Sequence, residues 1–236
     1  MTTLLHISSS PRGEVSESLN LARVFLDEYR GAHPEAVVDT LDLWQEPLPV
    51  FDGSKAGAKM AVIGGGTPTG AQRTAWDAIT KVFDRFNAAD RYLFSVPVWN
   101  GGIPYVLKHY IDVISQPGLV FAFDPTSGYR GLIEGRRATA ICTSGVYARG
   151  VAPAFGSDFH STYFEDWLRF AGIFDIVSVR FQPTLLTADA ATARRTEARA
   201  CTAINSWIHL SPHVHVRRRH RHPLRSYRPR RRANSR

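Results

Sequence analysis

Short apolar runs and longer amphipathic segments follow one another along the chain. Apolar runs typical of buried strands occupy 4–7, 36–43, 91–96, 138–142 and 176–181. Apolar residues at helical spacing occupy 19–29, 74–87, 104–115, 159–170 and 189–207. In the first of these segments, Leu19, Ala22, Leu26 and Tyr29 share one face. The pattern predicts five strands, each followed by a helix.

This alternation indicates an α/β fold in which the strands form a parallel sheet. Five strands suit a doubly wound, flavodoxin-like sheet with helices on both faces. In such sheets ligands bind beyond the carboxyl ends of the strands, close to the switch in strand order. The loops after the first, third and fourth predicted strands are therefore the candidate sites.

The segment between the second strand and the helix at 74–87 is rich in glycine and proline, so we expect an irregular excursion there. Its run Gly64–Gly70 does not fit the dinucleotide motif G-x-G-x-x-G, because Thr69 stands at the sixth position. We interpret it as flexible, and as a possible border of the site in a dimer.

The loop after the first strand reads "SSSPRGEVSES" from Ser8 to Ser18. A helix that starts near Ser16 presents unpaired N–H groups and a partial positive charge, which favour an anion. The Gly-Lys-Ser/Thr ending of a Walker loop is absent. The simpler interpretation is that Ser16 or Ser18 only caps the helix. Five serines in one turn favour a phosphate site.

The loop after the third strand, Pro97–Pro104, combines an aromatic residue, an amide and two glycines before a helix. An aromatic ring here can pack against a flat ring system, and glycine permits close backbone approach. The simpler interpretation places Trp99 in the core of an ordinary turn. The loop Thr143–Tyr147 after the fourth strand is less specific.

The formal charge of +8 belongs to the end of the chain. Residues 211–236 contain ten of the 29 basic residues and none of the 21 acidic ones, so residues 1–210 carry 19 basic and 21 acidic side chains. We predict a domain at 1–210 and a disordered tail at 211–236. The tail is either a binder of nucleic acid or anionic surfaces, or a segment translated from a shifted frame; we prefer the second hypothesis.

Other features limit the class of protein. No apolar stretch approaches the roughly 20 residues of a membrane span, and no signal peptide is recognisable. Two cysteines form neither a disulfide framework nor a zinc site, which suits a reducing cytoplasm. His6 and Cys142 are expected in the core. We expect His160 to be a surface histidine at a helix start, with a proton donor as the alternative.

The chain resembles the FMN-dependent NADH-azoreductases, which are flavodoxin-like quinone reductases of the cytoplasm. The resemblance spans Met1 to about Asn205. It is carried by Ser10 with Ser16-Glu17-Ser18, by "PVWNGGIPYVLKHYID", by Gly118–Phe121, by Gly131–Arg136 and by "AFGSDFHSTYFEDWLRFAGI".

The resemblance implies which residues bind FMN. Ser10, Ser16, Glu17 and Ser18 match the phosphate loop of the family. Pro97, Val98, Trp99 and Asn100 match the segment that lines the isoalloxazine ring. Ser144 lies in a further flavin-contacting loop, which reads Thr-Ser-Gly-Val here where the family often has Ser-Arg-Gly-Gly. Homodimers with flavin sites near the interface are typical of the family.

The implied reaction is a ping-pong hydride transfer. NADH reduces the flavin at N5, for which the backbone N–H near Asn100 is the candidate partner, and a quinone or an aromatic azo compound then takes two electrons. We expect no catalytic side chain and no metal ligand, because the flavin carries the redox chemistry. The alternatives are an NADPH-dependent FMN or chromate reductase, a flavodoxin-like electron carrier, and a nucleic-acid binder acting through the tail.

Overall fold

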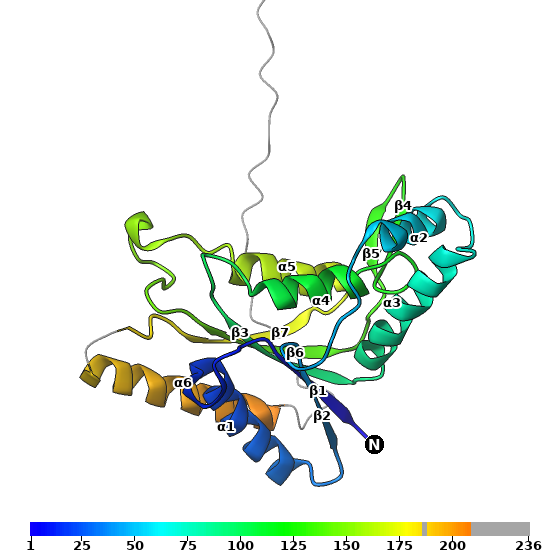
Figure 1. The fold of residues 1–236 in the computed structure, drawn as a ribbon. Coiled ribbons are helices and arrows are strands. Elements are labelled where there is room, and N and C mark those ends of the chain that lie inside the picture. The colour runs from blue at the N-terminus through cyan, green and yellow to red at the C-terminus, as the bar shows by residue number, and fades with distance from the viewer. Residues whose placement is uncertain (186–187, 209–236) are drawn as a thin grey trace, which may run out of the picture.

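The computed structural model describes residues 1–185 and 188–208. Its centre is a parallel sheet of five strands in the order β2-β1-β3-β6-β7 (Figure 1). The strands are β1 (Thr3–Ser8), β2 (Val37–Asp42), β3 (Arg91–Pro97), β6 (Arg137–Thr143) and β7 (Asp175–Phe181). The predicted flavodoxin-like sheet is confirmed, and all five strands lie where the apolar runs predicted them.

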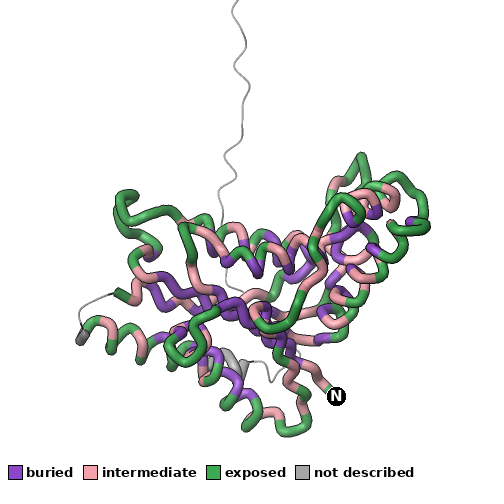
Figure 2. Tube along the Cα trace, viewed as in Figure 1, coloured by how far each residue is buried: buried purple, intermediate pink, exposed green. Residues whose placement is uncertain are grey.

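Helices cover both faces of the sheet (Figure 1). Helices α1 (Glu17–Ala32) and α6 (Ala188–Ile208) pack on one face, while α3 (Ala71–Asn87), α4 (Tyr105–Ile114) and α5 (Ser161–Ala171) pack on the other. Each layer has its own apolar cluster: the first includes Phe25 and the second includes Phe94. Because the central strands are covered on both sides, they are buried almost throughout (Figure 2).

One helix and one β-hairpin were missing from the sequence prediction. The segment expected to be irregular contains helix α2 (Gly53–Ile63), so that expectation was wrong. Asp52 caps this helix by accepting hydrogen bonds from the N–H groups of Ser54 and Lys55 at 3.1 and 3.2 Å. After α4, the antiparallel strands β4 (Phe121–Asp124) and β5 (Gly128–Gly131) form a hairpin.

The hairpin joins α5 through a close backbone contact. Ile133 N–H donates to the carbonyl of Ala171 at 2.9 Å. A Cβ atom added to Gly131 would lie 2.5 Å from Cα of Gly172, with the backbone of Ala171 and Gly172 closer still. Only glycine at position 131 allows the two chains to approach this closely.

His6 and Cys142 lie in the core, as predicted. The ring nitrogen Nε2 of His6 lies 2.9 Å from the hydroxyl of Ser95 on β3. Burial, with a smaller contribution from Arg30, lowers the pKa of His6 to about 4, so its ring is neutral near pH 7. Burial raises the pKa of the Cys142 thiol to about 12.

The predicted tail at 211–236 lies outside the described residues. None of the helices within 1–185 and 188–208 has the long apolar stretch that a bilayer-spanning segment requires.

Candidate functional site

The three candidate loops meet at one edge of the sheet. The register pairs Ser8 of β1 with Ser95 of β3, and Pro97 of β3 with Thr143 of β6. The pairing continues one step past the strand ends, since Val98 N–H donates to the carbonyl of Thr143 at 2.7 Å. The carboxyl ends of three neighbouring strands therefore carry the loops that the sequence singled out.

The serine loop leads directly into α1. Gly13 has a φ of +53°, which turns the chain through a short 3₁₀ segment, Gly13–Val15, before the helix starts. Ser16 is the N-cap, and its hydroxyl accepts from Leu19 N–H at 3.4 Å. The Ser16 and Ser18 hydroxyls lie 3.2 Å apart. The capping interpretation is thus correct for Ser16, but it does not account for its neighbours.

Ser10 differs from Ser9, the serine before it, in its hydrogen bonding. Its side chain is buried, and its Oγ has no hydrogen-bond partner among the described residues. Ser9, by contrast, donates to the carbonyl of Ser95 at 2.6 Å. A buried hydroxyl without a partner is destabilising by about 1–3 kcal/mol. An oxyanion at the amino terminus of α1 would accept from Ser10 and would also suit the helix dipole.

Glu17 has a different environment from the serines. Its carboxylate pairs with the guanidinium of Arg195 on α6, at 2.5 Å from Nη2 and 3.3 Å from Nε. Its backbone N–H belongs to the first turn of α1, where amides lack partners within the helix. Any anion contact by Glu17 is therefore expected through the backbone rather than the carboxylate.

The loop after β3 forms a tight turn. Trp99 and Gly102 exchange two backbone hydrogen bonds of 2.9 and 3.0 Å. Asn100 and Gly101 between them have φ values of +49° and +83°, as in a type I′ turn. These bonds do not use the amides of Asn100 and Gly101. The Asn-Gly dipeptide is a strong signal for this turn, and the sequence prediction overlooked it.

Trp99 is exposed, and Trp44 connects it to a further aromatic residue, Tyr105. The Trp99 side chain is 42% exposed, so the core interpretation was wrong. Trp44, just after β2, lies 6.5 Å from Trp99 between ring centroids, and it contacts Tyr105 edge-on at 5.3 Å. The Trp44 indole N–H donates to the carbonyl of Ser9 at 3.0 Å. Nothing in the local sequence around Trp44 indicated this link between the two loops.

Ser144 in the third loop is buried, and its hydroxyl donates to the carbonyl of Tyr147. Its own carbonyl accepts from Thr184 N–H at 2.8 Å, which ties this loop to the segment after β7. The Ser144 hydroxyl is therefore committed within the loop. Its backbone remains at the same sheet edge as Val98.

His160 is not on the surface, so the preferred prediction for it was wrong. Only 1% of the residue is exposed, and Nε2 donates to the carbonyl of Val96 at 3.0 Å. Burial lowers the pKa of His160, which keeps the ring neutral. A neutral ring whose N–H is held by Val96 supports the end of β3, and it is poorly suited to donate a proton to a substrate.

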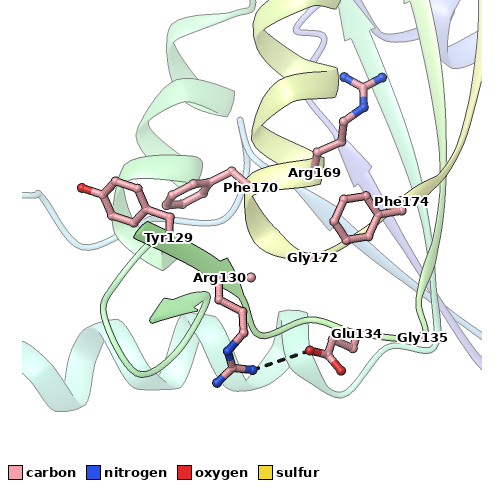
Figure 3. Close-up of a pocket in the computed structure, with 9 residues that line it drawn as sticks. Tyr129, Arg130, Glu134, Gly135, Arg169, Phe170, Gly172 and Phe174 are labelled. Atoms are coloured by element: carbon pink, nitrogen blue, oxygen red, sulfur yellow. Dashed lines mark ion pairs between the residues drawn. The ribbon is translucent and has the colours of Figure 1, made fainter. Parts of the chain in front are cut away.

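A cavity of about 450 Å³ lies at the opposite edge of the sheet, before the amino ends of β6 and β7 (Figure 3). Its aromatic lining residues are Tyr129, Phe170 and Phe174. Arg130 and Glu134 on its rim form an ion pair of 3.6 Å. Among the residues that the structure describes, no group of three or more His, Cys, Asp or Glu side chains is placed to hold a metal ion.

Comparison with known proteins agrees with the observed fold. Residues 2–204 match a family described as having a flavodoxin-like fold. The chain is 51% identical over 189 residues to the FMN-dependent NADH:quinone oxidoreductase of Ruegeria pomeroyi, covering 80% of this chain and 93% of that protein. It is 45% identical over 202 residues to the protein of the same name from Desulfotalea psychrophila, covering 85% and 93%.

A solved structure has a similar fold. An azoreductase from Bacillus anthracis superposes with a TM-score of 0.80 at 27% sequence identity, covering 88% of this chain and 100% of that one.

Proposed function

The chain belongs to the flavodoxin-like fold family, among relatives named FMN-dependent NADH:quinone oxidoreductases, and on this basis we propose that it catalyses the same reaction. In this reaction NADH is the electron donor and a quinone is the acceptor. Its likeness to an azoreductase structure supports reductive cleavage of aromatic azo compounds as a second activity.

One observation in this chain supports the proposal most directly. The unpartnered hydroxyl of Ser10 lies in the loop between β1 and the amino terminus of α1, and Trp44 links this loop to the exposed turn at Trp99. An anion site next to a flat aromatic surface matches the phosphate and the ring of FMN. The donor set is neutral and hydroxyl-rich, so it fits a dianionic phosphate without a lysine.

The residues that would hold FMN follow from this arrangement. Ser10, Ser16, Ser18 and the Glu17 amide would bind the phosphate, while Pro97, Val98, Trp99 and Asn100 would line the ring. Ser144 would belong to a further loop that contacts the flavin. Bound FMN supplies a carrier that takes two electrons from NADH and passes them on. The chain itself binds and orients: the turn at Asn100 and Gly101 offers two amides outside the strand pairing.

We expect the purified protein to be yellow, to release FMN on denaturation and to be bleached by NADH without oxygen. Initial rates with a quinone should give parallel double-reciprocal plots, because donor and acceptor use the same site in turn. A colourless protein that does not take up FMN would contradict the proposal. Bleaching by NADPH alone would favour the NADPH-dependent reductase, and binding of FMN without bleaching would favour the electron carrier.

We also propose that the protein is a homodimer. Phe123 and Tyr129 of the hairpin are 57% and 64% exposed, and their ring centroids lie 4.9 Å apart. Tyr129 also contacts Phe170 of α5, which lines the cavity of Figure 3. A contiguous exposed aromatic surface of this kind commonly marks an interface. Light scattering tests this directly, since a particle of one 26.3 kDa chain would exclude the dimer.

Two further expectations accompany the proposal. Residues 1–210 are proposed as the FMN-binding unit, which the family match over 2–204 supports. The cytoplasm is proposed as the compartment, supported by the two free thiols, Cys142 and Cys201.

A further inference from the structure

A carboxylate stands within the proposed phosphate site. Glu17 lies between Ser16 and Ser18 in the first turn of α1, where the backbone N–H groups and the helix dipole favour an anion. A carboxylate in this turn suits the apoprotein for the same reason, but it repels a second anion bound there. A phosphate dianion therefore binds well only if the charge of Glu17 is offset.

Arg195 of the last helix supplies the opposite charge. Its guanidinium contacts both carboxylate oxygens of Glu17, at 2.5 Å from Nη2 and 3.3 Å from Nε, in a two-bond fork that lysine cannot form. Only 23% of the Glu17 side chain is exposed, so water screens its charge incompletely. Glu14, the other carboxylate of the loop, is 88% exposed and pairs with Arg23 in α1. Of these two carboxylates, Glu17 is the one whose charge depends on a distant part of the chain.

The fold holds Arg195 at the edge of the sheet where the proposed site lies. Its guanidinium carbon Cζ lies 5.6 Å from the ring centroid of Phe181, the last residue of β7. Phe181 is paired in register with Thr143 of β6, so both stand at the carboxyl edge. One turn further along α6, Ala198 is buried in the apolar cluster that includes Phe25 of α1. The packing of α6 against α1 and β7 therefore fixes the position from which Arg195 reaches Glu17.

We propose that Arg195 is a positioning residue for the cofactor phosphate: by neutralising Glu17, it allows the amino terminus of α1 to accept a dianion. Arg195 acts through Glu17 and does not itself bind the phosphate. The last helix thus contributes to the cofactor site, although it lies outside the three candidate loops. This inference rests on the proposed function, because it concerns the phosphate of the same cofactor.

Two flavins separate an effect on the phosphate from an effect on the ring. The apoprotein is titrated with FMN and with riboflavin, which has the same ring without the phosphate, and binding is followed by flavin fluorescence. Arg195→Gln leaves Glu17 unpaired, so FMN affinity should fall about tenfold, whereas riboflavin affinity should change less than about twofold. Because the ion pair is partly exposed, the melting temperature of the apoprotein should fall by less than about 4 °C.

Removing the charge of Glu17 as well is expected to restore binding. The double variant Glu17→Gln/Arg195→Gln has no net charge at the two positions, like the wild-type pair, and its FMN affinity should lie within about threefold of the wild type. Glu17→Gln alone leaves the positive charge of Arg195 unopposed, so it should bind FMN more tightly than the wild type. Weaker binding by this single variant would contradict the proposal, and it provides a test even if Arg195→Gln does not fold.

Arg194→Gln is the matched control. It removes the same charge from the neighbouring position of α6, where Arg194 donates to the carbonyl of Gln182 at 2.9 Å rather than to a carboxylate. Its FMN affinity should stay within about twofold of the wild type, because no buried or half-buried carboxylate loses its partner. Equal losses of FMN affinity in Arg194→Gln and Arg195→Gln would overturn the specific role of Arg195.

The outcomes separate this inference from the proposed function. Suppose that the wild-type protein binds FMN and is bleached by NADH. If Arg195→Gln then weakens FMN and riboflavin equally, weakens neither, or is not rescued by Glu17→Gln, the inference is wrong and the proposed function stands. If the wild-type protein does not bind FMN at all, both proposals fail.

Discussion

The Ser10→Asp variant is expected to lose FMN affinity by about a thousandfold or more. The new carboxylate would face the phosphate at the amino terminus of α1, and such a like-charge pair costs several kcal/mol, where each 1.4 kcal/mol is about tenfold in affinity. Ser10→Ala removes only the donor, and a hydrogen bond to a charged group contributes about 1.5–3 kcal/mol. Its expected loss is therefore about 10- to 100-fold. Fluorescence titration of the apoprotein with FMN measures both.

Ser9→Ala is the matched control for Ser10, and the two should behave in opposite ways. Ser9 donates to the Ser95 carbonyl, so its loss should lower the free energy of unfolding by about 1 kcal/mol and leave FMN affinity within about threefold. The unpartnered hydroxyl of Ser10 does not stabilise the apoprotein, so Ser10→Ala should leave its melting temperature unchanged or raise it. Equal losses of FMN affinity in both variants would contradict the assignment of Ser10 to the phosphate.

Gly131→Ala is expected to have the largest effect on folding. The added methyl group would lie 2.5 Å from Cα of Gly172, against backbone that has no rotamer with which to yield. Either the hairpin or the end of α5 must move, which breaks the hydrogen bond from Ile133 to Ala171. We expect a loss of about 4 kcal/mol or more, hence a melting temperature lower by about 10 °C or more, or no folded protein.

Gly31→Ala is the control for this substitution. Gly31 lies in α1 with open space around the position of a Cβ, and its φ is not in the left-handed region. Alanine is a better helix former by up to about 1 kcal/mol, so this variant should be as stable as the wild type or slightly more. Thermal unfolding followed by circular dichroism measures both variants. The steric explanation is wrong if Gly131→Ala has the same melting temperature as the wild type.

The sequence predicted the sheet well because of how its strands are buried. A strand covered on both faces has a nearly continuous apolar run, and in Leu4–Ile7 and Tyr92–Val96 only His6 and Ser95 interrupt it. Helix α2 was missed because glycine and proline surround it, although its Ala, Lys and Met residues have good helix propensity. There the capping carboxylate of Asp52 and contacts with α3 outweigh the flanking residues.

Candidate site residues could be proposed from the sequence where the signal is local. Ser10, Ser16 and Ser18 stand in one loop, and the Asn100-Gly101 pair has a recognisable turn signal. The positions of Trp44 and His160 could not be predicted from neighbouring residues, because their hydrogen-bond partners lie 35 and 64 residues away in the sequence. A histidine at a helix start is usually exposed, and only the fold places His160 beneath the carbonyl of Val96.

The ion pair between Glu17 and Arg195 has a consequence for biosynthesis. The partners are 178 residues apart, so the first helix leaves the ribosome long before the last helix is made. Strand β1 also pairs with β3, which is synthesised more than eighty residues later. The serine loop is consequently among the first segments translated and among the last to acquire its complete surroundings. Capture of the cofactor is therefore expected to follow the synthesis of β3 and α6, as a late step in the assembly of the enzyme.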